Sequence, residues 1–261
     1  MKVVKADLPA SLESAEIVTI ADWHYADPQS NHGRILQDIE YIRTHNNCYC
    51  VLNGDIMNCA ITSSVSDTYG DTLSPMEELR ECTRLFEPLA RDGKILCVNP
   101  GNHERRHYKT NGIDITELMC RQLGIEDRYS PTSALVFIRL GKQKDKYHGR
   151  KVLYTMYVTH GNGGGRKEGG KINRLADLAS IVDTDIYIHS HTHTPAVMKQ
   201  SFYRLNQQKA SVNEVEKLFV NSSAMLSYGG YGQVASFKPS SNACPVIYLT
   251  ATRAKKMWAT L

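Results

Sequence analysis

Short apolar runs alternate with helix-like patterns through the first half of the chain. Strands are predicted at residues 16–21, 48–53 and 94–99, and a helix at 32–45, where isoleucines recur on one face. A second helix is predicted from Pro75 to about Arg91, because Ser74, Pro75 and Glu77 match an N-cap, an N1 proline and a capping-box glutamate. Helices that separate buried strands are typical of parallel βαβ units.

The second half of the chain is richer in strands. Strand-like runs lie at residues 134–140, 152–160, 186–189, 219–221, 234–237 and 246–250. Helices are predicted at 171–182 and around 114–123. So many strands exceed one simple open sheet, which favours an α/β fold with two sheets packed face to face and helices outside. No long Pro/Gly/Ser linker divides residues 1–261, so we expect a single domain, with 104–150 as a candidate insertion or cap.

Composition excludes several classes of protein. No apolar run approaches the ~18 residues of a transmembrane helix, and the N-terminus lacks the apolar stretch of a signal peptide. The seven cysteines are an odd number without C-x-x-C spacing, which indicates reduced thiols in a cytoplasmic protein. The net charge of +4 argues neither for nor against a nucleic-acid partner.

Polar side chains gather where the predicted strands end. The clusters are Asp22 with His24, Asp55 with Asn58, Asn102 with His103 and Glu104, His160, and His189 with His191 and His193. Ligands collect at the carboxyl ends of strands in α/β sheets, so these clusters point to one shared site. On an extended chain, the i, i+2 spacing would place Asp22 and His24 on one side, and likewise His191 and His193.

These residue types predict a metal centre. Carboxylate, amide oxygen and imidazole without thiolate suit Mn²⁺ best, and also Fe or Zn²⁺, whereas the imidazoles make Mg²⁺ less suitable. Seven potential ligands are too many for one tetrahedral zinc, which takes about four. Two divalent ions that share a bridging carboxylate would use the set economically.

The motifs D-x-H, G-D-x-x-N, G-N-H-E, H-G and H-x-H follow one another between Asp22 and His193. This order resembles the calcineurin-like metallophosphoesterase superfamily. The resemblance implies a four-layer αββα sandwich with two mixed β-sheets and a dinuclear centre bridged by Asp55. It implies that one metal is held by Asp22, His24, Asp55 and His193, and the other by Asp55, Asn102, His160 and His191. Ser190 departs from the family pattern, since it stands where the last motif usually has glycine.

The resemblance also implies a reaction. The hypothesis is a metal-dependent phosphoesterase in which a metal-bridging hydroxide attacks a phosphate mono- or diester. His103, beside Asn102, is the non-ligand histidine expected to assist the leaving group, since imidazole titrates near neutral pH.

Candidate substrate contacts are less specific. Asn58, Arg105 and Arg106 follow the ligand motifs, and Arg166, Lys167 and Lys171 lie in a basic glycine-rich loop at residues 161–171. Arginine and lysine could bind phosphate oxygens, but a loop-capping asparagine, solvated arginines and a surface loop without a role fit equally well. His189 is an extra histidine, for which packing at a strand end is favoured over a role in the site.

Several functions stay open at this point. The substrate could be a small-molecule monoester, a cyclic nucleotide or another diester, and the main alternative is a DNA-processing nuclease (exo- or endonuclease) of the same superfamily. A protein phosphatase is less favoured, because the arginine that this branch carries after the second motif is missing. A non-catalytic metal-holding scaffold and a single-zinc hydrolase are the competing classes. A membrane partner is not expected, and the sequence leaves the physiological metal and the oligomeric state open.

Overall fold

The computed structural model describes residues 1–261 apart from 63, 65–68, 142–150, 164 and 252–254. Within the described residues, five strands form one sheet in the order β11-β10-β2-β3-β4. Their bounds are β2 Ser14–Ile20, β3 Cys48–Asn53, β4 Ile95–Asn99, β10 Val246–Thr250 and β11 Met257–Thr260. β2, β3 and β4 run parallel, as the βαβ pattern predicts, while β10 joins β2 antiparallel.

Six further strands form the second sheet, in the order β1-β5-β6-β7-β9-β8. Their bounds are β1 Lys2–Asp7, β5 Ser133–Leu140, β6 Val152–Thr159, β7 Ile186–His189, β8 Ala196–Asn206 and β9 Ser211–Asn221. β6, β7 and β9 are parallel neighbours, whereas β5 and β6, and β8 and β9, pair antiparallel. Both sheets are therefore mixed.

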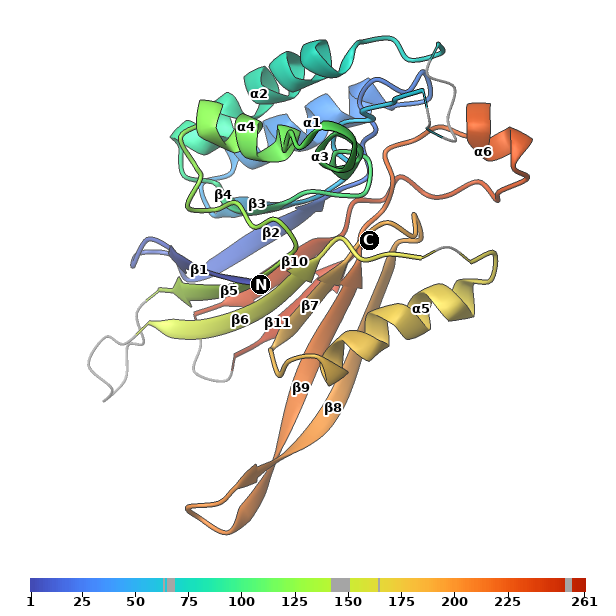
Figure 1. Ribbon diagram of the computed structural model, residues 1–261. Coiled ribbons are helices and arrows are strands. Elements are labelled where there is room, and N and C mark those ends of the chain that lie inside the picture. Colours follow the sequence, from blue (N-terminus) through green and yellow to red (C-terminus); the bar gives the residue numbers. More distant parts are fainter. Residues whose placement is uncertain (63, 65–68, 142–150, 164, 252–254) are drawn as a thin grey trace.

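Helices lie on the two outer faces of the stacked sheets (Figure 1). Their bounds are α1 His32–Thr44, α2 Pro75–Arg91, α3 Arg105–Asn111, α4 Ile115–Gln122, α5 Glu168–Asp177 and α6 Gly230–Val234, and α5 continues into a 3₁₀ turn at Leu178–Ser180. In Figure 1, α1, α2 and α4 cover the five-stranded sheet and α5 covers the six-stranded sheet. The capping box at Ser74 forms with Glu77, so α2 begins where the sequence predicts it.

Three separate apolar clusters fill the spaces between the four layers. Trp23 stacks on Phe86 at 5.0 Å between the five-stranded sheet and its helices. Residues such as Ile17 and Met156 pack between the two sheets. On the far side, Leu175 of α5 packs against Tyr187 and its neighbours. Two sheets with helices outside and three cores confirm the α/β four-layer αββα sandwich.

Three details differ from the sequence prediction. The expected strand at 234–237 is wrong: Val234 ends the short helix α6, and both Val234 and Phe237 are exposed, so no sheet buries this run. β1 and β11 have no counterpart in the sequence prediction: β1 pairs in parallel with β5 along its whole length, and β11 pairs antiparallel with β10. Of β8 and β9 only residues 219–221 were expected, because the far half of this hairpin is exposed and lacks a buried face.

The stretch 104–150 contributes to the layers. α3 and α4 lie on the helix side of the five-stranded sheet, and β5 pairs with both β1 and β6 (Figure 1). Residues 142–150 lie outside the described part of the chain, so a cap there, like the single-domain organisation, stays a prediction. All seven cysteines are buried and free. In the part of the chain that the structure describes, no helix has the length and apolar character to cross a membrane.

Candidate metal centre

The seven expected ligands come together from both sheets. They lie just beyond the carboxyl ends of β2, β3, β4, β6 and β7, where Asn53 at the end of β3 donates a hydrogen bond to the Thr159 carbonyl of β6 at 2.8 Å. Three groups of side chains could each hold a cation: Asp22, His24 and His193; His24, Asp55 and His103; and Asp55, His160 and His191. The topology thus joins the motifs that are far apart in the sequence.

The first group is closely spaced and includes an unsatisfied oxygen. His193 Nε2 lies 3.3 Å from His24 Nε2 and 3.2 Å from Asp22 Oδ1. Asp22 is fully buried, and its Oδ1 accepts no hydrogen bond. Its other oxygen, Oδ2, accepts one from the backbone N–H of His191 at 3.1 Å. A buried carboxylate oxygen without a donor, surrounded by imidazole nitrogens, fits a bound cation.

The third group, Asp55, His160 and His191, is organised around His160. Its Nε2 lies 3.3 Å from Asp55 Oδ2 and 3.3 Å from Asn102 Oδ1. Its Nδ1 lies 2.7 Å from the Asn53 carbonyl oxygen. A carbonyl can only accept a hydrogen bond, so Nδ1 is the donor. Nδ1 therefore carries a hydrogen, and Nε2 is the nitrogen that would bind a metal once it has released its proton, as in carbonyl-oriented histidine ligands generally.

The ligands converge through left-handed backbone and not through extended chain. Five of them have positive φ angles: Asp22 (52°), His24 (46°), Asp55 (51°), His191 (68°) and His193 (53°). The i, i+2 argument from an extended strand is therefore wrong, because both D-x-H and H-x-H lie past the strand ends. Each such non-glycine conformation costs about 1–3 kcal/mol, and its concentration at one place is typical of functional sites.

Two glycines allow the loops to approach closely. A Cβ on Gly101 would lie 2.0 Å from Asp55 Oδ1, and one on Gly54, whose φ is +84°, would lie 2.4 Å from the Gly101 nitrogen. Larger residues would push the loop after β3 away from the loop after β4. These glycines therefore hold Asp55 beside Asn102 and His103.

Electrostatics keep Asp55, His24 and His191 in the protonation states that bind metals. Burial disfavours ionisation of Asp55, but His160 and His103 outweigh it and hold the pKa of Asp55 well below its usual value. Burial lowers the pKa values of His24 and His191, so both rings are neutral near neutral pH. The donor set of ionised carboxylates and largely neutral imidazoles fits divalent cations. His160 differs: burial opposes its protonation, yet the Asp55 carboxylate raises its pKa to about 10.

His103 sits between Asp55 and Asn58. Its backbone N–H donates to Asp55 Oδ1 at 2.8 Å, and its Nδ1 lies 2.9 Å from the Asn58 carbonyl and 3.0 Å from Asn58 Oδ1. Nδ1 therefore carries a hydrogen, and Nε2 accepts one from Arg106 Nη2 at 3.0 Å. Burial and the Arg106 charge lower the pKa of His103, although Asp55 opposes this. With Nδ1 bonded to Asn58, only Nε2 remains for chemistry.

The other sequence candidates fall into two sets. Asn58 and Arg106 contact His103, whereas Arg105 turns away and donates to the Pro131 carbonyl at 2.9 Å. Lys171 donates to Thr194, the neighbour of His193, at 2.9 Å. Arg166 reaches the Ala235 carbonyl at 3.4 Å, and Lys167 is the exposed N-cap residue of α5.

Three buried or half-buried carboxylates support the loop after β3, and sequence patterns gave little sign of two of them. Glu104 accepts from the backbone N–H groups of Asp55 and Met57, each at 3.0 Å. Glu78 accepts from Asn58 and Cys59 at 2.5 and 2.9 Å, and Asp71 accepts from Asn58 Nδ2 at 2.8 Å. Glu104 follows the G-N-H motif, but Glu78 looks like an ordinary helix residue and Asp71 like a turn residue. A buried glutamate among the apolar positions of α2 is the one signal that could have revealed Glu78.

His189 and Ser190 have structural contacts below the ligands. His189 Nδ1 bonds to Asn221 Oδ1 at 2.8 Å, and its ring packs under Gly161, where an added Cβ would lie 2.1 Å from Nε2. Ser190 is fully buried and is not among the described residues with positive φ, so serine is not strained in place of glycine. Its hydroxyl accepts from Asn53 Nδ2 at 2.6 Å and pairs with Ser222 at 2.5 Å.

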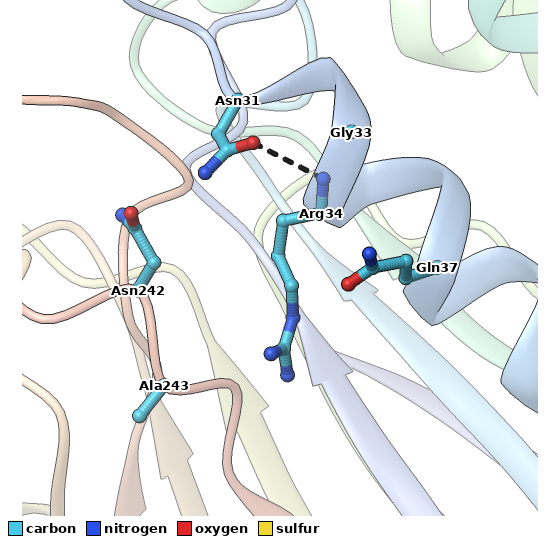
Figure 2. Close-up of a pocket in the computed structure, with 6 residues that line it drawn as sticks. All are labelled: Asn31, Gly33, Arg34, Gln37, Asn242 and Ala243. Atoms are coloured by element: carbon cyan, nitrogen blue, oxygen red, sulfur yellow. Dashed lines mark hydrogen bonds between the residues drawn. The ribbon is translucent and has the colours of Figure 1, made fainter.

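A surface hollow of about 520 Å³ lies apart from these ligands. It is lined by residues at the start of α1 and before β10, namely Asn31, Gly33, Arg34, Gln37, Asn242 and Ala243 (Figure 2). The Asn31 side chain there accepts from the Arg34 backbone at 3.1 Å, which is an ordinary helix N-cap. The hollow contains none of the candidate ligands.

Comparison with known proteins gives a family. The family model described as calcineurin-like phosphoesterase matches residues 15–195. Among similar solved structures, a predicted phosphoesterase from Streptococcus pneumoniae TIGR4 is 13% identical, covers 96% of this chain and 100% of that chain, and has a TM-score of 0.34. Vps29 complexed with Zn²⁺ from Entamoeba histolytica is 13% identical, covers 94% of this chain and 98% of that chain, and has a TM-score of 0.37. No curated protein matches.

Proposed function

The chain belongs to the calcineurin-like phosphoesterase family, and from this premise we propose that it hydrolyses phosphate esters at the site around Asp55. Family membership and the histidine and aspartate clusters support a metal-dependent phosphoesterase with a divalent metal centre. The reaction, the ligand set and the two-metal stoichiometry are the proposal.

One observation carries the proposal: buried Asp22 and Asp55, which follow strands of the five-stranded sheet, face imidazole nitrogens that follow strands of the six-stranded sheet, at 3.2–3.3 Å. We assign Asp22, His24, Asp55 and His193 to one ion and Asp55, Asn102, His160 and His191 to the other. Asp55 shares one cluster with His24 of the first ion and another with His160 and His191 of the second, which supports its role as the bridge. The mixed oxygen and nitrogen donors favour Mn²⁺, with Fe or Zn²⁺ as alternatives.

Bound cations would supply Lewis acidity toward a phosphoryl oxygen and toward water. The chain itself supplies the proton for the leaving group. His103 Nε2 is directed away from Asn58 and lies 3.9 Å from Asp55 Oδ2, so it faces the ligand cluster. Burial lowers the pKa of His103, so once Nε2 has taken up a proton from solvent the ring would give it readily to a departing alkoxide.

Arg106 is the basic side chain best placed for phosphate among the six sequence candidates for substrate contact. Its Nη2 lies 3.0 Å from His103 Nε2, and its Nη1 donates to the Asn58 carbonyl at 3.2 Å. A planar guanidinium can bind two phosphate oxygens at once, and it is half-buried here, which reduces screening. We assign it to substrate binding.

The test is an assay with added Mn²⁺ on p-nitrophenyl phosphate, bis-p-nitrophenyl phosphate, cyclic nucleotides, and single- and double-stranded DNA. We expect hydrolysis of mono- or diesters and two metal ions per chain by elemental analysis. No described contact favours a nucleic acid, so DNA is one arm of the test. Absence of turnover on every substrate with two metals bound would overturn the proposal.

His103→Ala sharpens this test. We expect it to retain both metals and to lose turnover by about 10²-fold or more on alkyl or phenyl phosphates, whose leaving groups need a proton. Arg105→Ala is the matched control, because Arg105 follows the same motif but contacts Pro131. Unchanged turnover of His103→Ala on an alkyl phosphate would remove His103 from this role.

A further inference from the structure

The segment that carries Asn58 is held by acidic side chains from distant parts of the chain. Glu78, on α2, accepts from the backbone N–H groups of Asn58 and Cys59. Asp71 accepts from the Asn58 side chain at 2.8 Å and also from the backbone N–H of Ala60. Glu78 thus fixes the backbone of the loop, whereas Asp71 is bonded to the Asn58 side chain, which contacts His103 Nδ1.

Asn58 forms a bridge between Asp71 and His103. Its Oδ1 lies 3.0 Å from His103 Nδ1, and its Nδ2 donates to Asp71 Oδ1. An amide can turn over so that its oxygen and nitrogen exchange places, and neighbouring donors and acceptors decide the orientation. A carboxylate has only acceptors, so Asp71 forces the nitrogen toward itself and the oxygen toward His103.

The orientation of this amide determines which atoms of His103 are available. With Oδ1 toward the ring, the hydrogen on Nδ1 meets two acceptors, the backbone and side-chain oxygens of Asn58. With Nδ2 toward the ring, a donor would face the hydrogen on Nδ1. The tautomer with hydrogen on Nε2 would then become relatively more stable. That tautomer has no Nε2 lone pair, so Arg106 could not donate to it as it does here.

We propose that Asp71 is a positioning residue, which acts through the Asn58 amide to keep hydrogen on Nδ1 of His103, so that Nε2 is the nitrogen that takes up a proton from solvent and passes it to the leaving group. The proposal rests on the function assigned above for His103 as the leaving-group partner. Asp71 touches neither substrate nor metal ligand in this arrangement. It contributes by fixing one tautomer and one ring orientation before substrate arrives.

The direct test is NMR of the imidazole nitrogens in ¹⁵N-histidine-labelled, metal-free protein. In the wild type we expect His103 to carry hydrogen on Nδ1. Asp71→Ala should shift the ring toward a mixture of tautomers, whereas Asp71→Asn, whose amide oxygen can still accept from Asn58, should restore the wild-type signal. Asp27→Ala is the matched control: it removes a nearby carboxylate that accepts from the Gln29 backbone at 2.8 Å and not from Asn58.

Activity gives the second readout. Asp71→Ala should lower kcat about 5–10-fold on phenyl phosphate and less than about 2-fold on 2,4-dinitrophenyl phosphate, with little change in KM, because only the poorer leaving group needs a proton. A merely structural loss would lower both rates together. Asp71→Leu fills the same space without an acceptor and replaces Asp71→Ala if that variant does not fold.

The outcomes separate this proposal from the assigned function. A wild-type His103 signal in Asp71→Ala, or equal loss on both esters, overturns the role of Asp71 while the phosphoesterase stands. If Asp71→Ala changes the tautomer of His103 but the wild-type protein hydrolyses none of the esters, the assigned function is overturned, while the positioning by Asp71 stands.

Discussion

The two halves of the metal centre are supported by different chemistry. In the half built on the five-stranded sheet, the loop of Asp55 and Asn58 is held by hydrogen bonds to carboxyl groups. Glu104 accepts hydrogen bonds from three backbone N–H groups, those of Asp55, Met57 and Gly101, the last at 2.9 Å. Each hydrogen bond to an ionised acceptor is worth about 1.5–3 kcal/mol, roughly twice a neutral one.

The half built on the six-stranded sheet is supported by neutral groups. Asn99 Nδ2 donates to the Val158 carbonyl and to Asn53 Oδ1, both at 3.1 Å. Asn221 donates to Thr192 at 2.8 Å and accepts from His189, so it holds the loop of His191 and His193. The candidate metal centre therefore rests on ionisable carboxyl groups on one side and on amides and hydroxyls on the other.

This difference has a consequence for pH. Neutral amides keep their hydrogen bonds at any pH from 5 to 9, whereas a buried carboxylate changes its charge within that range. Burial raises the pKa of Glu104 to about 7 and that of Glu78 to about 8. The carboxyl groups that support the first half should therefore respond to pH, whereas the amides and hydroxyls that support the second should not, and the predictions below test this contrast from the largest effect to the smallest.

Asp55→Ala breaks the link between the halves. Asp55 Oδ2 faces His160 of the other half, and its Oδ1 accepts from the backbone of His103. We expect the metal content to fall below two ions per chain and turnover to drop by about 10³-fold, since charge neutralisation and the bridge are lost together. Elemental analysis that finds two full sites in this variant would contradict the bridge.

Glu78→Gln tests the charged half. The pKa of Glu78 is raised from 4.5 to about 8, so between these values the folded protein keeps a proton that the unfolded chain has released. Unfolding then releases protons, and stability falls as pH rises through this window. In metal-free protein we expect the melting temperature of the wild type to fall between pH 5 and pH 9. The melting temperature of the Glu78→Gln variant should fall less over the same range.

The control for this prediction is Glu81→Gln. Glu81 lies on the same helix, is exposed, and pairs with Arg84 at 2.7 Å. Its pH profile should follow the wild type. Parallel profiles for Glu78→Gln and the wild type would show that Glu78 does not make this half sensitive to pH.

Ser190→Ala tests the neutral half and has the smallest expected effect. Without the hydroxyl, one N–H of Asn53 Nδ2 loses its acceptor, while the other still reaches the Thr159 carbonyl. We expect a loss of about 1–3 kcal/mol in unfolding free energy, measured by urea denaturation, with two metals retained. The loss should be equal at pH 5 and pH 9, and a pH-dependent loss would contradict the contrast between the halves.

Much of the fold could be predicted, because its signals are local. β3 and α2 were placed correctly, since a continuous apolar run and a proline after an N-cap residue both act within a few positions. The strand predicted at 234–237 is wrong, because apolar residues alone do not show whether a sheet covers them. β1 was missed since its exposed Val3 and buried Val4 form too weak a pattern beside charged neighbours.

The candidate ligands could also be predicted, but their geometry could not. Five motifs in order were enough to select Asp22, Asp55 and the histidines, and the structure brings these together. The sequence did not distinguish Arg105 from Arg106. Adjacent residues on a helix point in different directions, and only the packing of α3 decides which of the two faces the ligands. Nor could it show that Ser190 bonds with Asn53, 137 positions earlier in the chain.

The sequence by itself determined which donors are available and that each follows a strand, because strand ends and motif spacing are encoded within a few residues. The tertiary structure decided what surrounds them. Left-handed turns aim Asp22 and His193 at each other, and acids from α2 and the loop at Asp71 hold Asn58. These choices depend on hydrogen bonds between segments that meet only when the two sheets pack, so no local pattern contains them.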